Sequence, residues 1–454
     1  MKIAMISEHA SPLATLGSVD AGGQNVYVAS LAERLAHQGH SVSVYTRRDD
    51  PALPEVVPVA PGLEVVHVDA GPATHLPKDD LLPHMAAFGD ELSAAWSRPG
   101  AAPDVVHAHF WMSGLAGLAG TSGLGIPLVQ TFHALGSVKR RHQGADDTSP
   151  PDRVDLERLL CAEVDLVIAT CSDEVAELKA LGADPDRIDV VPCGVDIGRF
   201  RPDPRRGRRA SHRGDRLHAL SVGRLVERKG TETVIRALVE AVDVDLVVIG
   251  GPPAALLGAD PEARRLRDLA DELGVGDRVA LVGGVDQEGV RDAMHAADVV
   301  VCDPWYEPFG IVPIEAAACG RPVIGSAVGG LLDSVVHGRT GLLVPPKDPA
   351  ALAAAFGTLR ADPLLGEALG SAGRIRAERL YGWPTVARRT AHAYEDVVEA
   401  RARSSRPAGA GVGPVLDGAG LPAAAASAGP GVGPGAGPWP GGRDRGTGPT
   451  GEDR

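Results

Sequence analysis

Short β-like apolar runs alternate with amphipathic helical patterns along most of the chain, and this alternation constrains the fold more than any other feature. One series begins with KIAMI and the helical pattern of residues 26–39, and a second begins with HALSVGR and the helical pattern of residues 231–241. Strands that alternate with helices predict βαβ units and a parallel sheet. We therefore expect an α/β fold with two doubly wound, Rossmann-like domains facing a cleft, where the carboxyl ends of the strands bind ligands.

Composition divides the chain further. An Arg-rich segment with proline and glycine separates the two series and is interpreted as a linker, with an anion-binding patch as the alternative. The end of the chain is rich in glycine and proline without apolar periodicity, which predicts disorder. The expected divisions are a first domain at residues 1–195, a linker at 196–216, a second domain at 217–380, a helix at 381–403 and a tail at 404–454.

The balance of charge and the cysteine pattern exclude several classes of protein. With 45 Lys and Arg against 59 Asp and Glu, the net charge of −14 disfavours binding to nucleic acid or to an anionic membrane by bulk electrostatics. The five cysteines are scattered without C-x-x-C spacing, so neither a disulfide framework nor a structural zinc site is indicated. No apolar run is long enough for a signal sequence or a transmembrane segment. We expect a cytoplasmic protein.

Three loops after β-like runs carry residues suited to an anionic ligand. Gly22 and Gly23 precede a helix, whose exposed N–H groups favour phosphate, although a simple turn is the alternative. Arg224 and Lys229 in VGRLVERKG could neutralise a diphosphate without a metal ion, although surface charges are the more common reading of such a pair. Neither segment matches G-x-G-x-x-G or a P-loop, which disfavours a dinucleotide oxidoreductase.

The third loop, within YEPFGIVPIEAAACGRPVI, is more specific. Glu307 lies in the loop after a strand, and Glu315 falls on a mostly apolar helix that starts near Ile311. A carboxylate on an apolar helix needs a partner, such as a pair of sugar hydroxyls. The backbone N–H groups of Phe309, Gly310 and Ile311 lie at the start of that helix, so one loop could offer an anion hole and a hydroxyl acceptor.

Together, these segments and His133 in QTFHALG resemble the retaining glycosyltransferases of family 4, which have the GT-B fold, over roughly residues 1–400. The resemblance implies transfer of a hexosyl group from a nucleotide-diphosphate sugar, with a UDP-sugar expected, to a small acceptor. It implies no metal ion and no cofactor, and a C-terminal helix from Trp383 that returns to the first domain. A nucleotide-sugar 2-epimerase and an idle sugar-nucleotide-binding protein are the alternatives, although the Glu307/Glu315 segment fits transferases better.

The resemblance also implies roles for individual residues. Arg224 and Lys229 would hold the diphosphate, Glu307 would accept from the transferred sugar, and His133 would lie beneath that sugar. Residues 282–285 resemble the loop that reads the base, although an ordinary turn is an equal alternative. The implied donor-binding residues are Gly22, Gly23, Val285, Phe309, Gly310, Ile311 and Glu315. His107 and His109 alternate on a strand, but a third metal ligand is lacking, so a metal site is disfavoured.

On the acceptor side, GGQNVYV, LPKDDLLPHM and FHALG resemble the mycothiol-pathway D-inositol-3-phosphate N-acetylglucosaminyltransferases, the sucrose-phosphate synthases, or both. Lys78 matches the lysine expected to grip the acceptor phosphate, and Asn25 and Arg153 match further acceptor contacts. Phe110 and Ala134, however, replace the Tyr and Thr of the inositol-phosphate enzymes, which removes two hydroxyl donors.

Two readings of the acceptor remain open. Lys78, Arg153 and Lys139 or Arg140 bind a phosphorylated acceptor, or the pocket takes an unphosphorylated one and Lys78 is solvated. We favour a phosphorylated small acceptor, with inositol 1-phosphate as the first compound to test and fructose 6-phosphate as the second.

Overall fold

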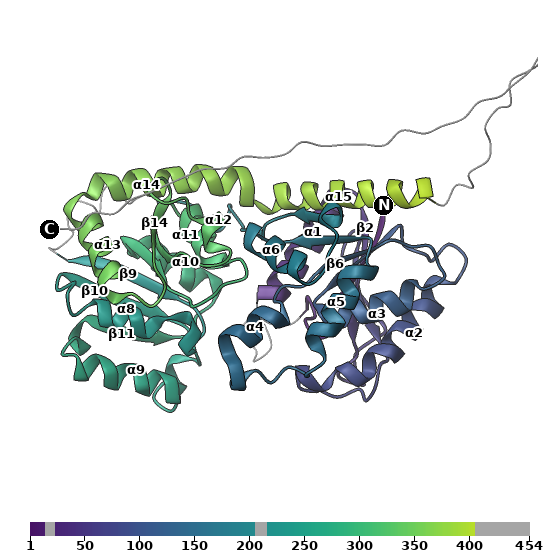
Figure 1. Ribbon diagram of the computed structural model, residues 1–454, viewed down its shortest axis with the longest axis horizontal. Helices are drawn as coiled ribbons and strands as arrows, with labels where there is room; N and C mark the ends of the chain where they lie inside the picture. Colours follow the sequence, from purple (N-terminus) through teal and green to yellow (C-terminus); the bar gives the residue numbers. More distant parts are fainter. Residues whose placement is uncertain (14–22, 205–215, 405–454) are drawn as a thin grey trace, which may run out of the picture. The chain divides into compact units, whose positions relative to one another are not determined.

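The computed structural model describes residues 1–13, 23–204 and 216–404. Their strands form two sheets (Figure 1), one of eight strands in the order β3-β4-β2-β1-β5-β6-β7-β8 and one of six in the order β11-β10-β9-β12-β13-β14. We call the first sheet with its helices lobe 1, and the second sheet with its helices lobe 2. The predicted α/β architecture with two Rossmann-like lobes is confirmed. Gly22, the middle of the expected linker and the expected tail beyond residue 404 lie outside the described residues.

The strands of lobe 1 are short, apolar and largely buried. Their bounds are β1 (Lys2–Ile6), β2 (Ser41–Arg47), β3 (Val56–Ala60), β4 (Leu63–Val68), β5 (Val105–His109), β6 (Leu128–Thr131), β7 (Leu166–Ala169) and β8 (Ile188–Val190). All neighbours pair in parallel except β3, which pairs antiparallel with β4 at the sheet edge. The sequence did not predict this antiparallel edge strand. Its Pro58 cannot donate to a further strand, which protects the edge.

Six α-helices among the described residues of lobe 1 lie between these strands. They are α1 (Gly23–His37), α2 (Met85–Trp96), α3 (Trp111–Thr121), α4 (Gly136–Gln143), α5 (Arg153–Glu163) and α6 (Ser172–Ala180). Helices α2 and α3 approach each other closely at Gly89. A Cβ atom there would lie only 2.4 Å from the Cβ of Ala119. Glycine is required there by packing rather than by backbone conformation.

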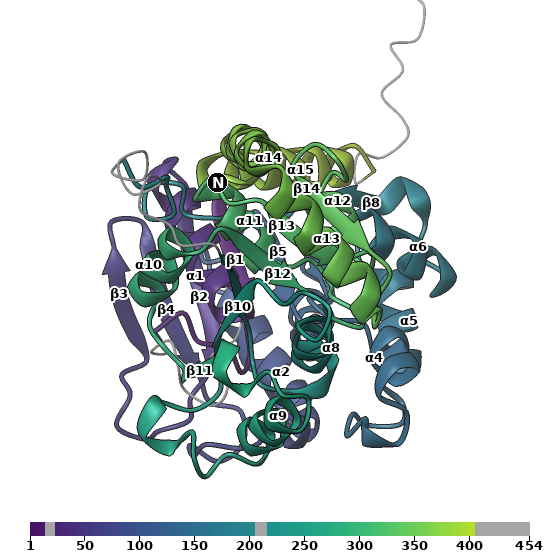
Figure 2. The ribbon, with the colours of Figure 1, turned by 90° about the vertical axis from the view of Figure 1, so that its left-hand side faces the viewer.

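Lobe 2 repeats the alternation in the order read from the sequence (Figure 2). Its strands are β9 (Leu217–Val222), β10 (Val244–Ile249), β11 (Val279–Gly283), β12 (Val299–Cys302), β13 (Val323–Ser326) and β14 (Gly341–Val344). Its α-helices are α8 (Thr231–Ala237), α9 (Pro261–Glu272), α10 (Gln287–Ala296), α11 (Ile311–Ala318), α12 (Leu331–Ser334), α13 (Pro349–Ala361) and α14 (Pro363–Arg376). An Asp side chain at the N-cap accepts the N–H of the third helical residue in each of α9, α10, α13 and α14.

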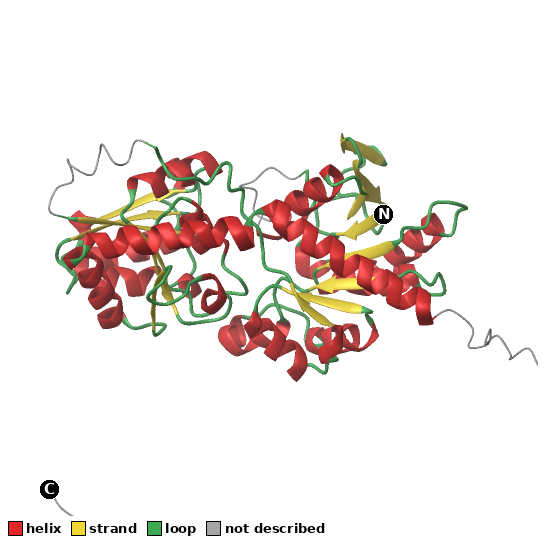
Figure 3. Cartoon of the chain, turned by 90° about the horizontal axis from the view of Figure 1, so that it is seen from above, coloured by secondary structure: helices red, strands yellow, loops and turns green. Residues whose placement is uncertain are grey.

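The last helix, α15 (Trp383–Ser404), returns to lobe 1, as expected. Its buried Tyr394 hydroxyl lies 2.6 Å from His107 Nδ1 on β5, and its Arg401 pairs with Asp165 at 2.9 Å. A residue-pair bridge between Val195 and Gly382 marks the place where the chain passes between the lobes. The helix is seen from above in Figure 3, where strands are yellow and helices red. Among the described helices, none combines the length and apolarity needed to span a membrane.

Candidate functional site

The carboxyl edge of the lobe 2 sheet carries the residues expected to hold the donor. Lys229 ends a 3-10 turn after β9, and its ammonium forms an ion pair with the Glu307 carboxylate, which comes from the loop after β12. Both side chains are partly buried, and they line a small cavity of about 40 Å3 together with Gly310 and Ile311. The fold thus brings together two charged groups that are 78 positions apart in the chain.

The loop from Glu307 to Gly310 is held by a close backbone approach. A Cβ atom at Gly330 would lie 2.3 Å from the Cα of Phe309, so only glycine fits between this loop and α12. The N–H of Gly330 donates to the carbonyl of Glu307 at 2.9 Å. Gly310 has a positive φ of 86° and precedes the first turn of α11, which leaves N–H groups at the helix start without intrahelical partners.

Two arginines lie near this loop. Arg224 directly follows Gly223 at the end of β9, and the guanidinium of Arg228 lies 5.3 Å from the ring centroid of Tyr306. Within the described ranges, neither arginine forms an ion pair. Their positive charge is therefore available to an anionic ligand, whereas that of Lys229 is shared with Glu307.

Glu315 and Val285 occupy different surroundings. Glu315 lies on α11, where burial raises the pKa of its carboxyl to about 7, partly offset by the positive charge of Arg199. Val285 follows β11 and is 41% exposed, and the next residue, Asp286, caps α10. Strands β9, β11 and β12 are parallel members of one sheet, so these residues lie at the same carboxyl edge.

From lobe 1, the start of α1 lies close to the donor loop. A Cβ atom at Gly23 would meet the side chain of Ile311 in lobe 2 at 3.4 Å. Asn25, two residues further along, is buried, and its amide donates to the carbonyl of Ser11 at 3.2 Å. The structure therefore places Gly23 at the interface of the lobes and Asn25 in a buried contact within lobe 1.

His133 follows β6 with a positive φ of 61°, which is uncommon for a residue other than glycine. Its Nε2 lies 3.1 Å from Nδ1 of His109. Burial lowers the pKa of His133 to about 3, with Lys78 and His9 adding to the effect, so its ring is neutral at pH 7. The ring nitrogens of His107 contact Tyr394 and Thr131, whereas His109 contacts His133. Among the described residues, no group of three side chains could hold a metal ion.

Lys78 and Arg153 lie over one aromatic ring. The Lys78 ammonium is 3.9 Å from the ring centroid of Phe110, and the Arg153 guanidinium is 5.1 Å from the same centroid. Lys78 is partly buried rather than solvated, and burial lowers its pKa to about 8, assisted by repulsion from Arg153. In the part of the chain that the structure describes, Lys78 forms no ion pair.

Arg153 is fixed by a buried network. Its Nε donates to Glu157 at 2.8 Å, and both Glu157 oxygens accept the N–H of Gly136 at the start of α4. A second Arg153 nitrogen donates to the carbonyl of Ala134 at 2.6 Å. The other two basic residues considered for the acceptor are less available: Lys139 pairs with Asp147 at 2.9 Å, and Arg140 donates to a backbone carbonyl.

The sequence reasoning missed Glu8, which lies two residues after the end of the buried strand β1. Its carboxylate is 1% exposed, accepts from the Ser113 hydroxyl, and lies 2.6 Å from Nδ1 of His9. Hydrogen bonds and the nearby imidazole lower its pKa in spite of burial. An acidic residue after a continuous apolar run was the signal that could have found it. Glu8 also lines a cavity of about 240 Å3 that includes Lys78.

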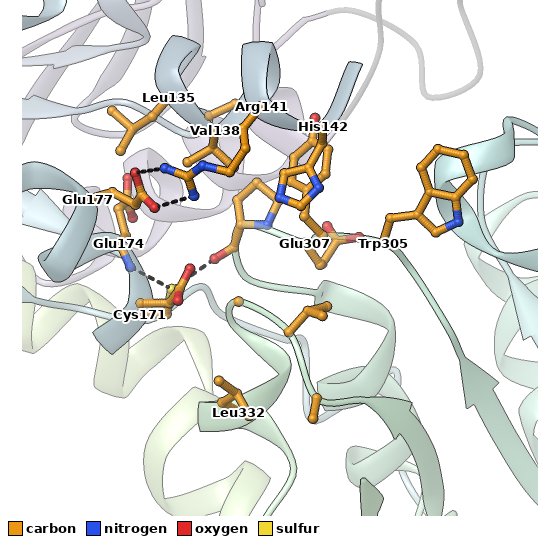
Figure 4. A pocket seen from close by; sticks show the side chains of 17 residues that line it. Leu135, Val138, Arg141, His142, Cys171, Glu174, Glu177, Trp305, Glu307 and Leu332 are labelled. Atoms are coloured by element: carbon orange, nitrogen blue, oxygen red, sulfur yellow. Dashed lines mark hydrogen bonds and ion pairs between the residues drawn. The ribbon is translucent and has the colours of Figure 1, made fainter. Parts of the chain in front are cut away.

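A cavity of about 250 Å3 is lined by residues of both lobes (Figure 4). Arg141 and Glu177 form a two-point ion pair on the lobe 1 side, and the ring of His142 stacks at 4.7 Å on that of Tyr306 from lobe 2. Glu307 and Ala134 also line it, so the cavity adjoins both the donor loop and the acceptor side. Nearby, the Cys171 thiol donates to the carbonyl of Pro308.

Comparisons with known proteins agree with this geometry. Residues 21–199 match the family model "Glycosyltransferase Family 4", and residues 206–376 match "Glycosyl transferases group 1". The chain is 40% identical to the D-inositol 3-phosphate glycosyltransferase of Streptomyces scabiei over 87% of this chain and 90% of that protein. A D-inositol 3-phosphate glycosyltransferase from Catenulispora acidiphila is 38% identical over 88% of this chain and 95% of that protein.

The solved structure of sucrose-phosphate synthase from Thermosynechococcus elongatus is 35% identical, with a TM-score of 0.78 over 88% of this chain and 99% of that chain. The GT-B fold expected from the sequence is therefore confirmed, as is the assignment to the glycosyltransferases. The chain belongs to glycosyltransferase family 4.

Proposed function

We propose that this protein transfers a hexosyl group from a UDP-sugar to a small phosphorylated acceptor with retention of the anomeric configuration. Inositol phosphate is the first acceptor to test, because relatives with about 40% identity carry the name D-inositol 3-phosphate glycosyltransferase. Fructose 6-phosphate is the second, because the sucrose-phosphate synthase structure is 35% identical to this chain.

The donor is proposed to bind at the carboxyl edge of lobe 2. Its diphosphate would meet Lys229, Arg224 and the N–H groups at the start of α11, where positive charge and a helix N-terminus act together. Because Lys229 is paired with Glu307 in the free protein, the diphosphate must compete with that carboxylate. Glu307 would then turn to the hydroxyls of the transferred sugar, and Glu315 would accept from the ribose hydroxyls.

The proposed reaction needs few protein groups. The acceptor hydroxyl forms a bond to the anomeric carbon while the bond from that carbon to the diphosphate oxygen breaks, and the departing diphosphate takes the acceptor proton. The charge that develops on the diphosphate is stabilised by Lys229 and Arg224, so no metal ion is required. The neutral His133 would supply a hydrogen-bonding surface beneath the sugar and would not act as a general acid at pH 7.

The observation that carries the acceptor proposal is the position of Lys78. Its ammonium lies partly buried over Phe110 and forms no ion pair among the described residues, and Arg153 is held beside the same ring. The Glu8 carboxylate lines the same cavity but is already bound to Ser113 and His9. A partly buried cation that forms no ion pair favours a phosphate as its ligand. The apolar Phe110 and Ala134 offer this phosphate no hydroxyl donors, which leaves the two cations as its main contacts.

The proposal is tested by pairing each acceptor with its dephosphorylated form. The assay measures UDP release and product formation with UDP-glucose or UDP-N-acetylglucosamine as donor, on wild type and Lys78→Ala. We expect product only with a phosphorylated acceptor, and a loss in Lys78→Ala confined to that form. Equal kcat/KM for both forms, or an equal loss in both, would remove the phosphate site.

The same assay separates the alternatives. Conversion of the donor sugar without transfer would favour an epimerase, and tight UDP binding without turnover would favour an idle binding protein. Lys179→Ala is the matched control, because Lys179 is an exposed lysine of α6 in the same lobe. It should leave every acceptor unaffected.

A further inference from the structure

A second concentration of positive charge occurs in lobe 2, away from the residues described above. A cavity of about 390 Å3 lies where the loop before β14 meets the end of α14 and the π-helical segment η9 (Ala377–Tyr381). We call it the arginine cavity. It is lined by Val336, Arg339, Thr340, Ala372, Ile375, Arg376, Arg379 and Leu380. It shares no lining residue with the cavities that contain Glu307 or Lys78.

The charge of this cavity contrasts with that of the whole chain. Three arginines line it, and none of its lining residues is acidic, although the net charge of the protein is −14. Other arginines of lobe 2 are paired with carboxylates, for example Arg265 with Glu262 and Arg360 with Asp243. Within the described ranges, Arg339, Arg376 and Arg379 form no ion pair, in contrast to Arg265 and Arg360.

Arg376 is the best positioned of the three. It donates to the backbone carbonyl of Asp333 at 2.7 Å, and its guanidinium lies 5.6 Å from the ring centroid of Tyr381. Its Nε is buried and has no hydrogen-bond partner among the described residues. The side chain is therefore held by neutral groups, and one of its donors remains to be satisfied.

The backbone around the arginines is well ordered by hydrogen bonds. The N–H groups of Arg339 and Thr340 donate to the carbonyl of Val336, and the Thr340 hydroxyl accepts from the N–H of Val336 at 2.9 Å. On the other wall, the chain forms a π-helical turn, a geometry that is frequent at functional sites. Two segments held by these hydrogen bonds thus contribute the three arginines that line one cavity.

We propose that the arginine cavity binds a small organic phosphate. Guanidinium groups match the geometry of phosphate oxygens and bind them in a two-point manner. The remaining lining is largely apolar, with Val336, Ile375 and Leu380, and Ile375 is 58% exposed for a large hydrophobic residue. This surface suits the organic part of a ligand, and the volume falls in the range of small-molecule sites.

The test measures binding of phenyl phosphate by isothermal titration calorimetry. Three proteins are compared, and each carries Lys78→Ala and Lys229→Ala so that phosphate binding at the glycosyl-transfer site is suppressed. One has no further change, one adds Arg339→Ala and Arg379→Ala, and one adds Arg264→Ala and Arg267→Ala. The last pair removes the same charge from α9 in lobe 2, and neither residue lines the cavity.

We expect the Arg339/Arg379 changes to weaken phenyl phosphate binding at least tenfold and the Arg264/Arg267 changes to leave it within twofold. Inorganic phosphate should bind at least tenfold more weakly than phenyl phosphate, and phenol should not bind. Absence of binding, equal affinity in the three proteins, or equal affinity for inorganic and phenyl phosphate would overturn the proposal. Arg339 and Arg379 are exposed, so little loss of stability is expected, and Arg379→Gln alone repeats the test if the double change lowers the melting temperature.

Discussion

The two lobes hold their candidate site residues in different ways. In lobe 1, Arg153 and Glu157 form a buried pair, and Glu8 is enclosed by Ser113 and His9. In lobe 2, the cations lie on a loop after β9, and Lys229 is compensated by a carboxylate from another loop of the candidate site. Lobe 1 therefore positions these polar groups through its own core, whereas lobe 2 keeps Lys229 in a pairing that a ligand must rearrange.

This difference separates stability from ligand binding. A buried polar network is costly to leave incomplete, so lobe 1 residues should matter for folding as well as for the acceptor. A partly exposed pair contributes little to folding, so lobe 2 residues should matter mainly for the donor. The comparison predicts whether a substitution changes mainly folding stability or mainly ligand binding. The five predictions below are ordered by the size of the expected effect.

Breaking the buried pair of lobe 1 should have the largest effect. Glu157→Ala leaves Arg153 buried without its carboxylate and removes the acceptor for the N–H of Gly136, so we expect a loss of about 3–5 kcal/mol in the free energy of unfolding. Glu232→Ala, which breaks the exposed contacts of lobe 2 with Arg236 and Arg265, should cost about 1 kcal/mol or less. Urea unfolding measures both, and equal losses would contradict the comparison.

Removing the donor-side cation should act on catalysis instead. Lys229→Ala is expected to lower kcat/KM by about 2–4 kcal/mol of transition-state stabilisation, the size found for a lost charge-stabilising donor. Its urea midpoint should stay close to that of wild type, since the pair with Glu307 is only partly buried. Steady-state kinetics with Lys179→Ala as control checks this prediction, and a mainly structural loss would place Lys229 with the lobe 1 residues.

The charge of Lys78 gives the next effect. Because burial lowers its pKa to about 8, a growing fraction of Lys78 is neutral as the pH rises from 7 to 9. We expect KM for a phosphorylated acceptor to rise over this interval by up to about tenfold, which corresponds to roughly 1.4 kcal/mol of binding free energy. The dephosphorylated acceptor measures any general pH effect, and a parallel change in both forms would exclude Lys78 as the cause.

Glu315 should give a pH dependence of opposite sign on the donor. Burial raises its pKa to about 7, so the carboxyl is protonated below pH 7 and ionised above it. Only the ionised form accepts from both ribose hydroxyls, and KM for the donor should therefore fall as the pH rises from 6 to 8, by roughly tenfold or about 1.4 kcal/mol. Glu315→Gln should abolish this dependence, which a profile of donor KM against pH would reveal.

The smallest expected effect is that of metal removal. If Lys229 and Arg224 neutralise the diphosphate, activity after dialysis against EDTA should stay within about twofold of the untreated protein, less than about 0.4 kcal/mol. Activity that disappears with EDTA and returns with magnesium would assign the charge stabilisation to an ion instead.

The sequence was sufficient for the strand and helix alternation and for the start of α11 near Ile311, because both depend on local apolar patterns and on loops rich in glycine and proline. Helix α3 was not predicted from the sequence, because WMSGLAGLAGT contains three glycines and no amphipathic face. It is a helix because α2 packs closely against it at Gly89, a contact that local sequence does not contain.

The residues of the candidate site were likewise predicted only in part. Motifs singled out Lys229 and Glu307, but not that they pair with each other, because the contact joins loops after different strands. Glu8 and Glu157 carry no motif, and their importance lies in being buried beside partners that the fold supplies. Burial of a charge depends on tertiary structure, so sequence patterns alone could not reveal it.

The return of α15 to lobe 1 has a consequence for protein synthesis. The ribosome releases β1 to β8 first, yet Tyr394, the partner of His107 in the centre of that sheet, emerges only after the whole of lobe 2. At about 5–20 residues per second, synthesis of residues 191–382 takes roughly 10–40 s. During this time the nascent first sheet exposes the apolar surface that α15 later covers. His107 also lacks its hydrogen-bond partner Tyr394 in this interval. We expect this interval to be when the growing chain most needs a chaperone.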